Sequence, residues 1–155
     1  MSEAELKVAL VYNFARFVEW PERAFASAEA PLHLCLIGGD RFGPAFATIE
    51  KRKVQGRALK LRIGITAEES AGCHVAFIGD LSARQLPPTL RQLAGRPVLT
   101  VSDIEGFIDQ GGAIGIVPGE QRLQFEVNRT ALDQAELRAS SQLLKLARAV
   151  LGKGS

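Results

Sequence analysis

Apolar and polar residues follow two different periods along the chain, and these periods predict a mixture of strands and helices. Four short segments are almost continuously apolar, which is typical of strands covered on both faces of a sheet: 32–38, 73–79, 97–103 and 112–117. Two more alternate between apolar and polar residues, as strands with one exposed face do: 57–64 and 122–128. The turn at 118–121 joins two of these strands into a predicted antiparallel hairpin.

Helical periodicity occupies the segments between these strands. Residues 6–22 predict the first helix, and Pro87 and Pro88 are expected to divide the helical segment at 81–95. Helices or helical turns are also expected at 41–52 and 104–112. The end of the chain, 129–150, predicts one or two helices with five apolar residues facing inward: Leu143, Leu144, Leu146, Ala147 and Val150.

The order of these elements predicts the fold class. Strands that alternate with helices favour an α/β fold: a single three-layer sandwich with a mixed, mostly parallel sheet, helices on both faces and an antiparallel hairpin at the edge. The 155 residues have the length of one ordinary domain, and no repeat or linker interrupts them. We therefore predict one domain over residues 1–155 with an ordered core of about 5–151.

The first predicted helix has more apolar surface than one contact requires. Its apolar residues sweep an arc of about 200°, whereas a surface helix needs only about 100°. Lys7 falls inside this arc, one turn from the helix start, where its long side chain can reach solvent. One side of the helix is therefore expected to pack on the sheet. The other side needs a second neighbour, either the carboxyl-terminal helix of the same chain or another molecule.

Composition and charge exclude several classes of protein. Lysine and arginine number 19 against 17 aspartates and glutamates, and the basic residues are scattered, so no nucleic-acid partner is expected. The apolar runs are too short to span a bilayer, so no direct membrane insertion is expected. Residues 1–7 lack the basic and apolar regions of a signal peptide.

Three predicted strands end in an acid, at Asp40, Asp80 and Asp103. Doubly wound sheets bind ligands at the carboxyl ends of their strands, and a carboxylate cluster there is how a phosphoacceptor receiver domain holds Mg²⁺. A receiver also needs a lysine at the end of the last parallel strand, where this chain has Val117 and Pro118. Each Asp stands directly before a helical pattern, so we expect all three to be helix N-caps.

Other signs of enzyme or metal chemistry are weak. The segment GGDRFG (38–43) follows a strand and opens a helix, but Asp40 replaces the glycine that a dinucleotide-binding loop needs. No serine lies in a nucleophile elbow, so no catalytic residue and no enzymatic activity are predicted. A zinc site would have to assemble across two strands without the usual ligand spacing, so no metal and no cofactor are predicted; its ligands would be Cys35, Cys73, His33 and His74.

The chain has two cysteines, Cys35 and Cys73, and each lies in or begins an apolar strand. The predicted topology places these two strands side by side. Two alternatives remain open on the residues alone. The cysteines are either buried free thiols, which pack as small apolar groups, or they form a disulfide that would stabilise the fold by about 4 kcal/mol in the chain-entropy model.

Seven segments, taken together in their order and spacing, resemble one known family: YNFARFVEWP, LCLIGGDRFG, GCHVAFIG, VLTVSDIEGF, GGAIGIV, RLQFEVN and SSQLLKLA. Over about residues 6–150 the chain is similar to the YfiR family of periplasmic repressors. The resemblance implies a secreted periplasmic homodimer that binds the sensor region of an inner-membrane diguanylate cyclase of the YfiN type and holds it inactive. By this route it would lower cyclic di-GMP and restrain biofilm formation.

The resemblance also bears on the cysteines. Cys35 and Cys73 match two of the family's cysteine positions, which implies a disulfide between them that responds to redox conditions. Some members carry a second cysteine pair towards the carboxyl-terminal half, which this sequence lacks. Related domains are also fused to membrane sensor kinases, which supports an alternative function as a small-molecule-sensing module for a membrane signalling protein.

A repressor without an active site acts through its surface, because it must bind one conformation of its partner more tightly than another. Extra apolar area on the first helix can supply this difference. We expect Leu10, Phe14 and Phe17 to pack on the sheet. The partner or a second subunit is expected to contact the other side of the helix, at Val8, Val11, Tyr12 and Ala15.

Overall fold

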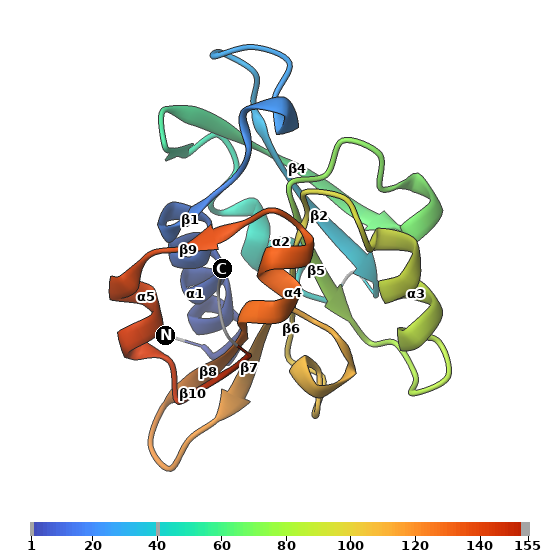
Figure 1. The fold of residues 1–155 in the computed structure, drawn as a ribbon, viewed down its shortest axis with the longest axis vertical. Helices are drawn as coiled ribbons and strands as arrows, with labels where there is room; N and C mark the ends of the chain where they lie inside the picture. The colour runs from blue at the N-terminus through green and yellow to red at the C-terminus, as the bar shows by residue number, and fades with distance from the viewer. Residues whose placement is uncertain (1, 40, 153–155) are drawn as a thin grey trace.

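A computed structural model describes residues 2–39 and 41–152 of the chain (Figure 1). This part contains the helices α1 (Glu3–Phe17), α2 (Gly43–Ala47), α3 (Leu86–Leu93), α4 (Arg129–Gln134) and α5 (Ser141–Leu146). Its strands are β1 (Val18–Glu19), β2 (Leu32–Gly38), β3 (Lys53–Val54), β4 (Arg57–Ile65), β5 (Val75–Gly79), β6 (Leu99–Ser102), β7 (Ile114–Pro118), β8 (Leu123–Asn128), β9 (Arg138–Ala139) and β10 (Ala149–Leu151). Three 3-10 helices lie in the connections: η1 (Glu22–Ala24), η2 (Ala67–Glu69) and η3 (Ile108–Gln110).

Eight of these strands form one mixed sheet in the order β10-β8-β7-β6-β5-β2-β4-β3 (Figure 1). Adjacent strands run parallel to one another from β7 through β6, β5 and β2 to β4, and β10 is parallel to β8. Only β8 against β7 and β3 against β4 are antiparallel. The predicted mixed, mostly parallel sheet is therefore confirmed. The strands β1 and β9 pair separately as a small antiparallel sheet.

Helices cover both faces of the sheet, because the central strands bury apolar side chains on each face. On one face Leu34 and Phe77 join a large core that includes residues of α1, α2 and α5. On the other face Ile37 and Ile78 pack with Leu86 of α3. Figure 1 shows α1 and α5 together on one side of the molecule and α3 on the opposite side. The predicted three-layer arrangement is confirmed.

Helix α1 ends at an earlier residue than the pattern of residues 6–22 predicts. It begins with a capping box, in which the Ser2 side chain accepts from the Glu5 amide and the Glu5 carboxylate accepts from the Ser2 amide. It ends at Phe17, because Val18 turns to an extended conformation and pairs with Ala139 of β9. Pro21 then disfavours a helical conformation at the residue before it.

The internal helices are also shorter than predicted. Within 41–52 only α2 is helical, and turns follow it. Pro87 and Pro88 lie in the first turn of α3, where missing amide hydrogens cost nothing, and so they open one helix instead of dividing a longer one. Residues 104–112 form turns and η3 in place of an α-helix.

The predicted hairpin is formed by β7 and β8, and a further strand lies outside it. Pro118 pairs with Leu123, and the Gly119 amide donates to the Arg122 carbonyl at 2.8 Å. The strand β10 adds to β8 because the Arg148 amide donates to the Phe125 carbonyl, also at 2.8 Å, where α5 has ended. The segment 129–150 thus contains two short helices, as one of the two predicted alternatives, together with two strands that were not predicted.

Candidate functional site

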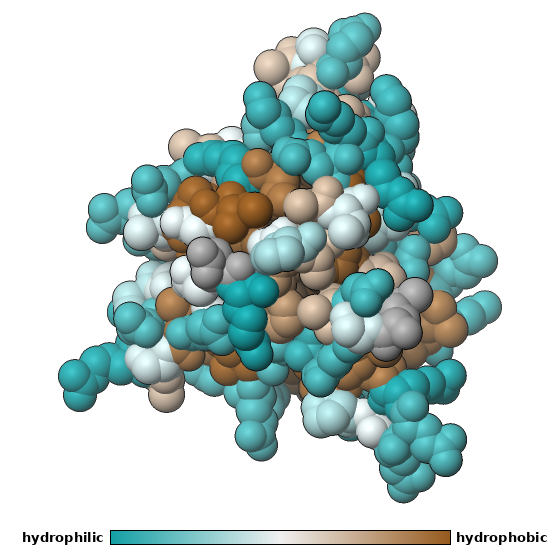
Figure 2. Space-filling model, turned by 180° about the vertical axis from the view of Figure 1, so that it is seen from behind, coloured by the Kyte–Doolittle hydropathy of each residue, from teal (hydrophilic) through white to brown (hydrophobic). Residues whose placement is uncertain are grey.

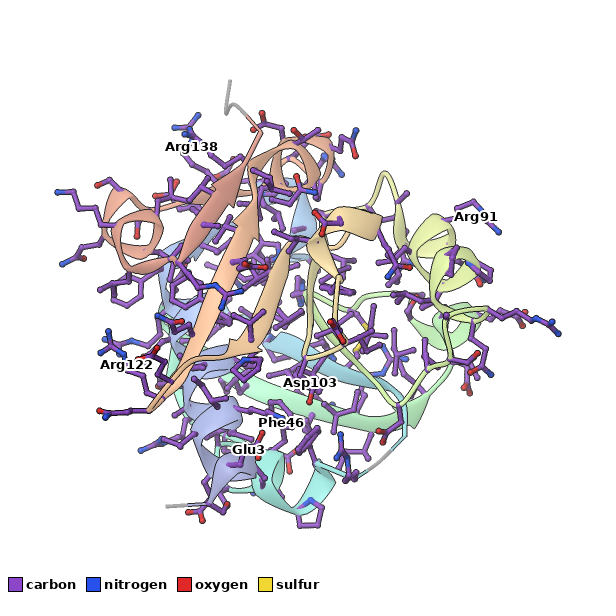
Figure 3. The ribbon with its side chains drawn as sticks, turned by 90° about the horizontal axis from the view of Figure 1, so that it is seen from below. Glu3, Phe46, Arg91, Asp103, Arg122 and Arg138 are labelled. Carbon is purple, nitrogen blue, oxygen red and sulfur yellow. A yellow bond between two sulfur atoms is a disulfide. The ribbon has the colours of Figure 1, made fainter. Side chains whose placement is uncertain are left out.

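The carboxyl ends of β5 and β6 carry a cluster of charged side chains in place of an open ligand site. Asp103 follows β6, and its Oδ2 lies 2.8 Å from Lys7 Nζ of α1 and 3.8 Å from an Nη of Arg41. The same guanidinium lies 3.3 Å from Asp80, which follows β5. In Figure 3, Asp103 lies near the middle of the view with Phe46 and Glu3 below it, whereas Arg91, Arg122 and Arg138 lie at the periphery.

These acids do not cap the helices that follow them, which corrects the sequence prediction. The N-cap of α3 is Gln85, and that of η3 is Phe107. Asp80 has a left-handed backbone with φ of 55° and serves as an ion-pair partner. Asp103 is paired with Lys7, 96 residues away in the sequence. Asp40, the third predicted cap, lies outside the described residues.

The glycines of GGDRFG are explained by close packing between strand ends. A side chain at Gly38, which has φ of 98°, would place its Cβ only 1.9 Å from the Gly79 carbonyl oxygen. At Gly39 a Cβ would lie 2.4 Å from a carboxylate oxygen of Asp80. The two glycines therefore allow β2 and β5 to end side by side, which accounts for them without a bound dinucleotide.

Lys7 was expected to reach solvent, but only 9% of its surface is exposed. Burial alone would lower the pKa of the amine. The hydrogen bond to Asp103 and the contact with Glu3 at 3.0 Å outweigh this effect and raise the pKa, so Lys7 stays charged. Its ammonium also lies 5.3 Å from the centre of the Phe42 ring. Lys7 therefore ties α1 to the end of the sheet.

Lys7→Met should lower the free energy of unfolding by about 2 kcal/mol, because Asp103 would keep only the more distant Arg41 as a partner. Urea denaturation at pH 7 measures this loss. Lys7→Met combined with Asp103→Leu leaves no unpaired carboxylate at this place. The double variant should therefore recover part of the lost free energy of unfolding. A loss below about 0.5 kcal/mol for the single variant would show that the ion pair does not hold α1 in place.

A disulfide joins Cys35 of β2 to Cys73, and the two Cα atoms are 6.0 Å apart. The implied pairing is confirmed, whereas its response to redox conditions stays a prediction. Both cysteines are buried, at 0% and 4% exposure. Arg62 donates to the Ala71 carbonyl at 2.7 Å and holds the segment that leads into Cys73. The bond therefore links β2 to the segment that leads into β5.

No metal site is formed by the residues that the structure describes. Both cysteine sulfurs are used in the disulfide, so they are not thiolate ligands in this state. Within 2–39 and 41–152, no group of three or more histidine, cysteine, aspartate or glutamate side chains is placed to hold a metal ion. His33 and His74 do lie side by side, with ring centroids 5.8 Å apart.

The structure corrects the partner contact predicted on α1. Val8, Val11 and Ala15 are at most 3% exposed and belong to the core, so they cannot contact another molecule in this conformation. Tyr12 is half-buried, and its hydroxyl donates to the Lys53 carbonyl at 2.7 Å. Phe14 packs inward as predicted, edge-on to Phe125 with centroids 4.9 Å apart.

The second side of α1 is covered by the same chain. The helix contacts α2, β3 and α5. Leu143 of α5 is buried in the same core, which supports the alternative of an intramolecular neighbour. Most of the apolar arc of α1 is therefore covered within one molecule, and Leu6, at 41% exposure, is the exception among its large side chains.

Three of the five large apolar side chains that are exposed among the described residues lie near the end of the chain; the other two are Leu6 and Ile63. Leu146, the last residue of α5, is 74% exposed, and Val150 and Leu151 of β10 are 39% and 40% exposed. We call these three residues the C-terminal surface. Leu146 and Val150 were expected to face inward. They do not, because α5 ends at Leu146 and the following residues extend along β8.

The C-terminal surface lies beside an unpaired strand edge. The strand β10 is the last in the order of the sheet, so one side of its backbone has no strand neighbour among the described residues. The rear face in Figure 2 shows hydrophilic side chains around most of the periphery with separate hydrophobic areas between them. Exposed apolar groups next to free backbone donors and acceptors are typical of a protein-binding surface.

A cavity of about 440 Å³ lies between α4, β9 and α5. It is lined by side chains of both charges, including Arg129, Asp133, Glu136 and Arg138. Sequence reasoning missed this cavity, because its walls come from a segment that was expected to form one or two helices, without the strand β9 between them. No α-helix among residues 2–39 and 41–152 has the length and hydrophobicity that a membrane crossing needs.

Comparison with known protein families gives a match along nearly the whole chain. A family model described as YfiR/HmsC-like matches residues 4–148 of the 155 residues. The matched range contains α1, the disulfide and all strands of the main sheet except β10.

Proposed function

Because the chain belongs to the YfiR/HmsC-like family of periplasmic regulators of cyclic di-GMP signalling, we propose that it binds the sensor region of a YfiN-type diguanylate cyclase. In the periplasm it holds this inner-membrane enzyme inactive, which lowers cyclic di-GMP and restrains biofilm formation. The family is regulatory and non-catalytic, and the proposed activity is accordingly binding without turnover.

The C-terminal surface is the observation that carries this proposal. Leu146, Val150 and Leu151 expose apolar area that the core does not use. Burying one such side chain contributes about 1.5 to 3 kcal/mol. Repression needs a preference of this size, because a difference of about 5.5 kcal/mol between two states of the cyclase shifts their ratio from 1:99 to 99:1. Because Leu146 is 74% exposed and Val150 and Leu151 are 39% and 40% exposed, burying all three supplies part of this preference, and other contacts with the cyclase would add the rest.

Leu146→Asp should weaken binding to the cyclase sensor region by at least about tenfold, since a charge would replace the most exposed apolar group. Titration of the immobilised sensor fragment with purified protein measures the change. The matched control is Ile63→Asp, because Ile63 on β4 is also exposed, at 44%, but lies near the other end of the sheet order. Its binding should stay within about twofold of the wild type.

The binding experiment has a clear opposing result. If Leu146→Asp binds the fragment as tightly as the wild type while Ile63→Asp does not, the contact lies at the β4 end of the sheet. Repeating the titration with oxidised and reduced protein tests redox control, and the oxidised form should bind more tightly. Equal affinities would mean that the Cys35–Cys73 bond only stabilises the fold.

We propose in addition that the protein is a homodimer, as the resemblance to the family implies. An exposed strand edge can pair with a second copy of itself across a twofold axis, so β10 is a candidate for this contact. Analytical ultracentrifugation of the wild type and of Leu146→Asp distinguishes the two uses of this surface. A variant that stays dimeric but loses the cyclase assigns the C-terminal surface to the cyclase alone.

The cavity between α4 and α5 favours a second candidate function, the sensing of a small molecule. Its volume of about 440 Å³ and its lining of both charges suit a compact polar ligand. Under this alternative a metabolite would raise the melting temperature of the isolated protein, and Arg138→Ala would remove that shift. A sensor fragment that never binds the protein would favour this alternative over repression by contact.

A further inference from the structure

His74 is nearly buried, at 6% exposure, where the chain enters β5. Both ring nitrogens are engaged with main-chain groups. The His33 amide donates to Nδ1 at 2.9 Å, and Nε2 lies 2.7 Å from the Ala24 carbonyl. An amide hydrogen needs a lone pair on Nδ1, and a carbonyl needs a hydrogen on Nε2. The ring is therefore neutral, with its proton on Nε2.

The partners of His74 belong to a connecting segment that lies over the starts of β2 and β5. We call residues 20–31 the arm. Trp20 Nε1 donates to the His74 carbonyl at 3.0 Å, and the Phe25 ring stacks on the imidazole with centroids 4.3 Å apart. Arg57 of β4 lies 3.6 Å from the Phe25 ring centre and donates to the carbonyls of Ser27 and Ala30. His74 is thus the centre of the contacts that hold the arm on the sheet.

A second proton on His74 would break this arrangement. Nδ1 would then carry a hydrogen that faces the His33 amide hydrogen, so one hydrogen bond would become a repulsive contact. The added charge would be buried, with His33 on β2 and Arg57 on β4 as the ionisable groups that act on it, and neither offers a negative charge. On the arm itself Arg23 is paired with Glu136. Release of the arm would return the ring to water.

We propose that the protein senses acidification through His74, whose protonation detaches the arm from the sheet. This function is separate from binding a cyclase and needs no partner. In a protein with the proposed periplasmic location, the surroundings follow the pH outside the cell, so the arm would report an external condition. The detached arm would also expose the ring of His74 at the entrance to β5.

The direction of the pH dependence follows from the surroundings of the ring. Burial lowers the pKa of His74 from its ordinary value of 6.5, the hydrogen bond to the Ala24 carbonyl opposes this, and the neighbouring His33 and Arg57 lower it further. The released state, with its higher pKa, takes up the proton more readily. The attached arm is therefore fully favoured above pH 6.5 and becomes less favoured as the pH falls below it, by up to about tenfold per pH unit.

The chain supplies its own reporter and its own control. Trp20 is the single tryptophan and belongs to the arm, and His33 and His74 are the two histidines. Between pH 7.5 and pH 4.5 we expect Trp20 fluorescence to shift to longer wavelength, with a midpoint below 6.5. His74→Gln keeps an amide donor for the Ala24 carbonyl but does not titrate, so the transition should vanish. His33→Gln keeps the backbone donor to His74 and should retain it.

Hydrogen exchange measures whether the arm detaches, and NMR measures whether the His74 ring takes up a proton. Exchange of peptides covering residues 20–31, corrected for the intrinsic effect of pH, should become at least about tenfold faster at low pH in the wild type and not in His74→Gln. If His74→Gln does not fold, an NMR titration of the His74 ring in the wild type decides the matter. A midpoint at or above 6.5, a Trp20 transition that persists in His74→Gln, or one that disappears only in His33→Gln would each overturn the proposal.

Discussion

Replacing Cys35 and Cys73 together with alanine should lower the free energy of unfolding by about 4 kcal/mol. The disulfide spans a sequence separation of 38 residues, and without it the unfolded chain regains the conformational freedom of that loop. Both side chains are buried, so the loss of two sulfur atoms from the core adds to the effect. Urea denaturation of the oxidised wild type and of the double variant, followed by circular dichroism, measures the difference.

The reduced wild type is the matched control for this prediction. It keeps both sulfur atoms but lacks the loop, so it should lose most of the same free energy if loop closure is the main cause. Reduced and oxidised proteins with the same urea midpoint would contradict the prediction. A midpoint that falls only in the double variant would assign the effect to packing of the sulfur atoms.

Val11→Asp should leave the protein unfolded at 25 °C. Val11 is 0% exposed within the core beneath α1. The substitution removes about 1.5 to 3 kcal/mol of apolar burial and places an unpaired carboxylate in the interior, which costs several kcal/mol more. The sum is comparable with the whole stability of a small domain, about 5 to 15 kcal/mol. Near-ultraviolet circular dichroism of the purified variant would show the loss of fixed tertiary packing.

The matched control for Val11→Asp is Leu6→Asp on the same helix. Leu6 is 41% exposed, so an aspartate there can stay hydrated. It also lies in the first turns of α1, where a negative charge is tolerated by the helix dipole. This variant should keep its stability to within about 1 kcal/mol. A Val11→Asp protein that unfolds cooperatively near the wild-type midpoint would mean that α1 does not pack as described.

The strands were predictable because their signal is local. In β2, Leu34 and Leu36 enter one core and Ile37 the other, so almost every position has to be apolar. The hairpin of β7 and β8 was also visible, since a short turn between two apolar segments leaves few other arrangements. The resemblance of seven ordered segments identified the family, which the match over residues 4–148 confirms.

The surroundings of α1 could not be read from the helix itself. Its neighbours α2, β3 and α5 come from segments distant in the sequence, so a wide apolar arc is equally consistent with a buried helix and with a shared interface. The partner of Lys7 is another example, because Asp103 lies 96 residues away. The end of the chain misled the prediction for a different reason: Leu143 and Leu146 have helical spacing, but Leu146 is the last residue of α5 and stays exposed while Leu143 is buried.

The strand order has a consequence for the time at which each part of the molecule can form. Everything that the disulfide requires, β2 and the segment that leads into β5, is present once the chain has been made as far as residue 79. An oxidant can therefore form the bond before the second half of the chain has folded. Helix α1 precedes these strands in the sequence but is covered later, because Phe14 rests against Phe125 in the last third of the chain. The apolar side of α1 is thus shielded later than the strands that follow it in the sequence.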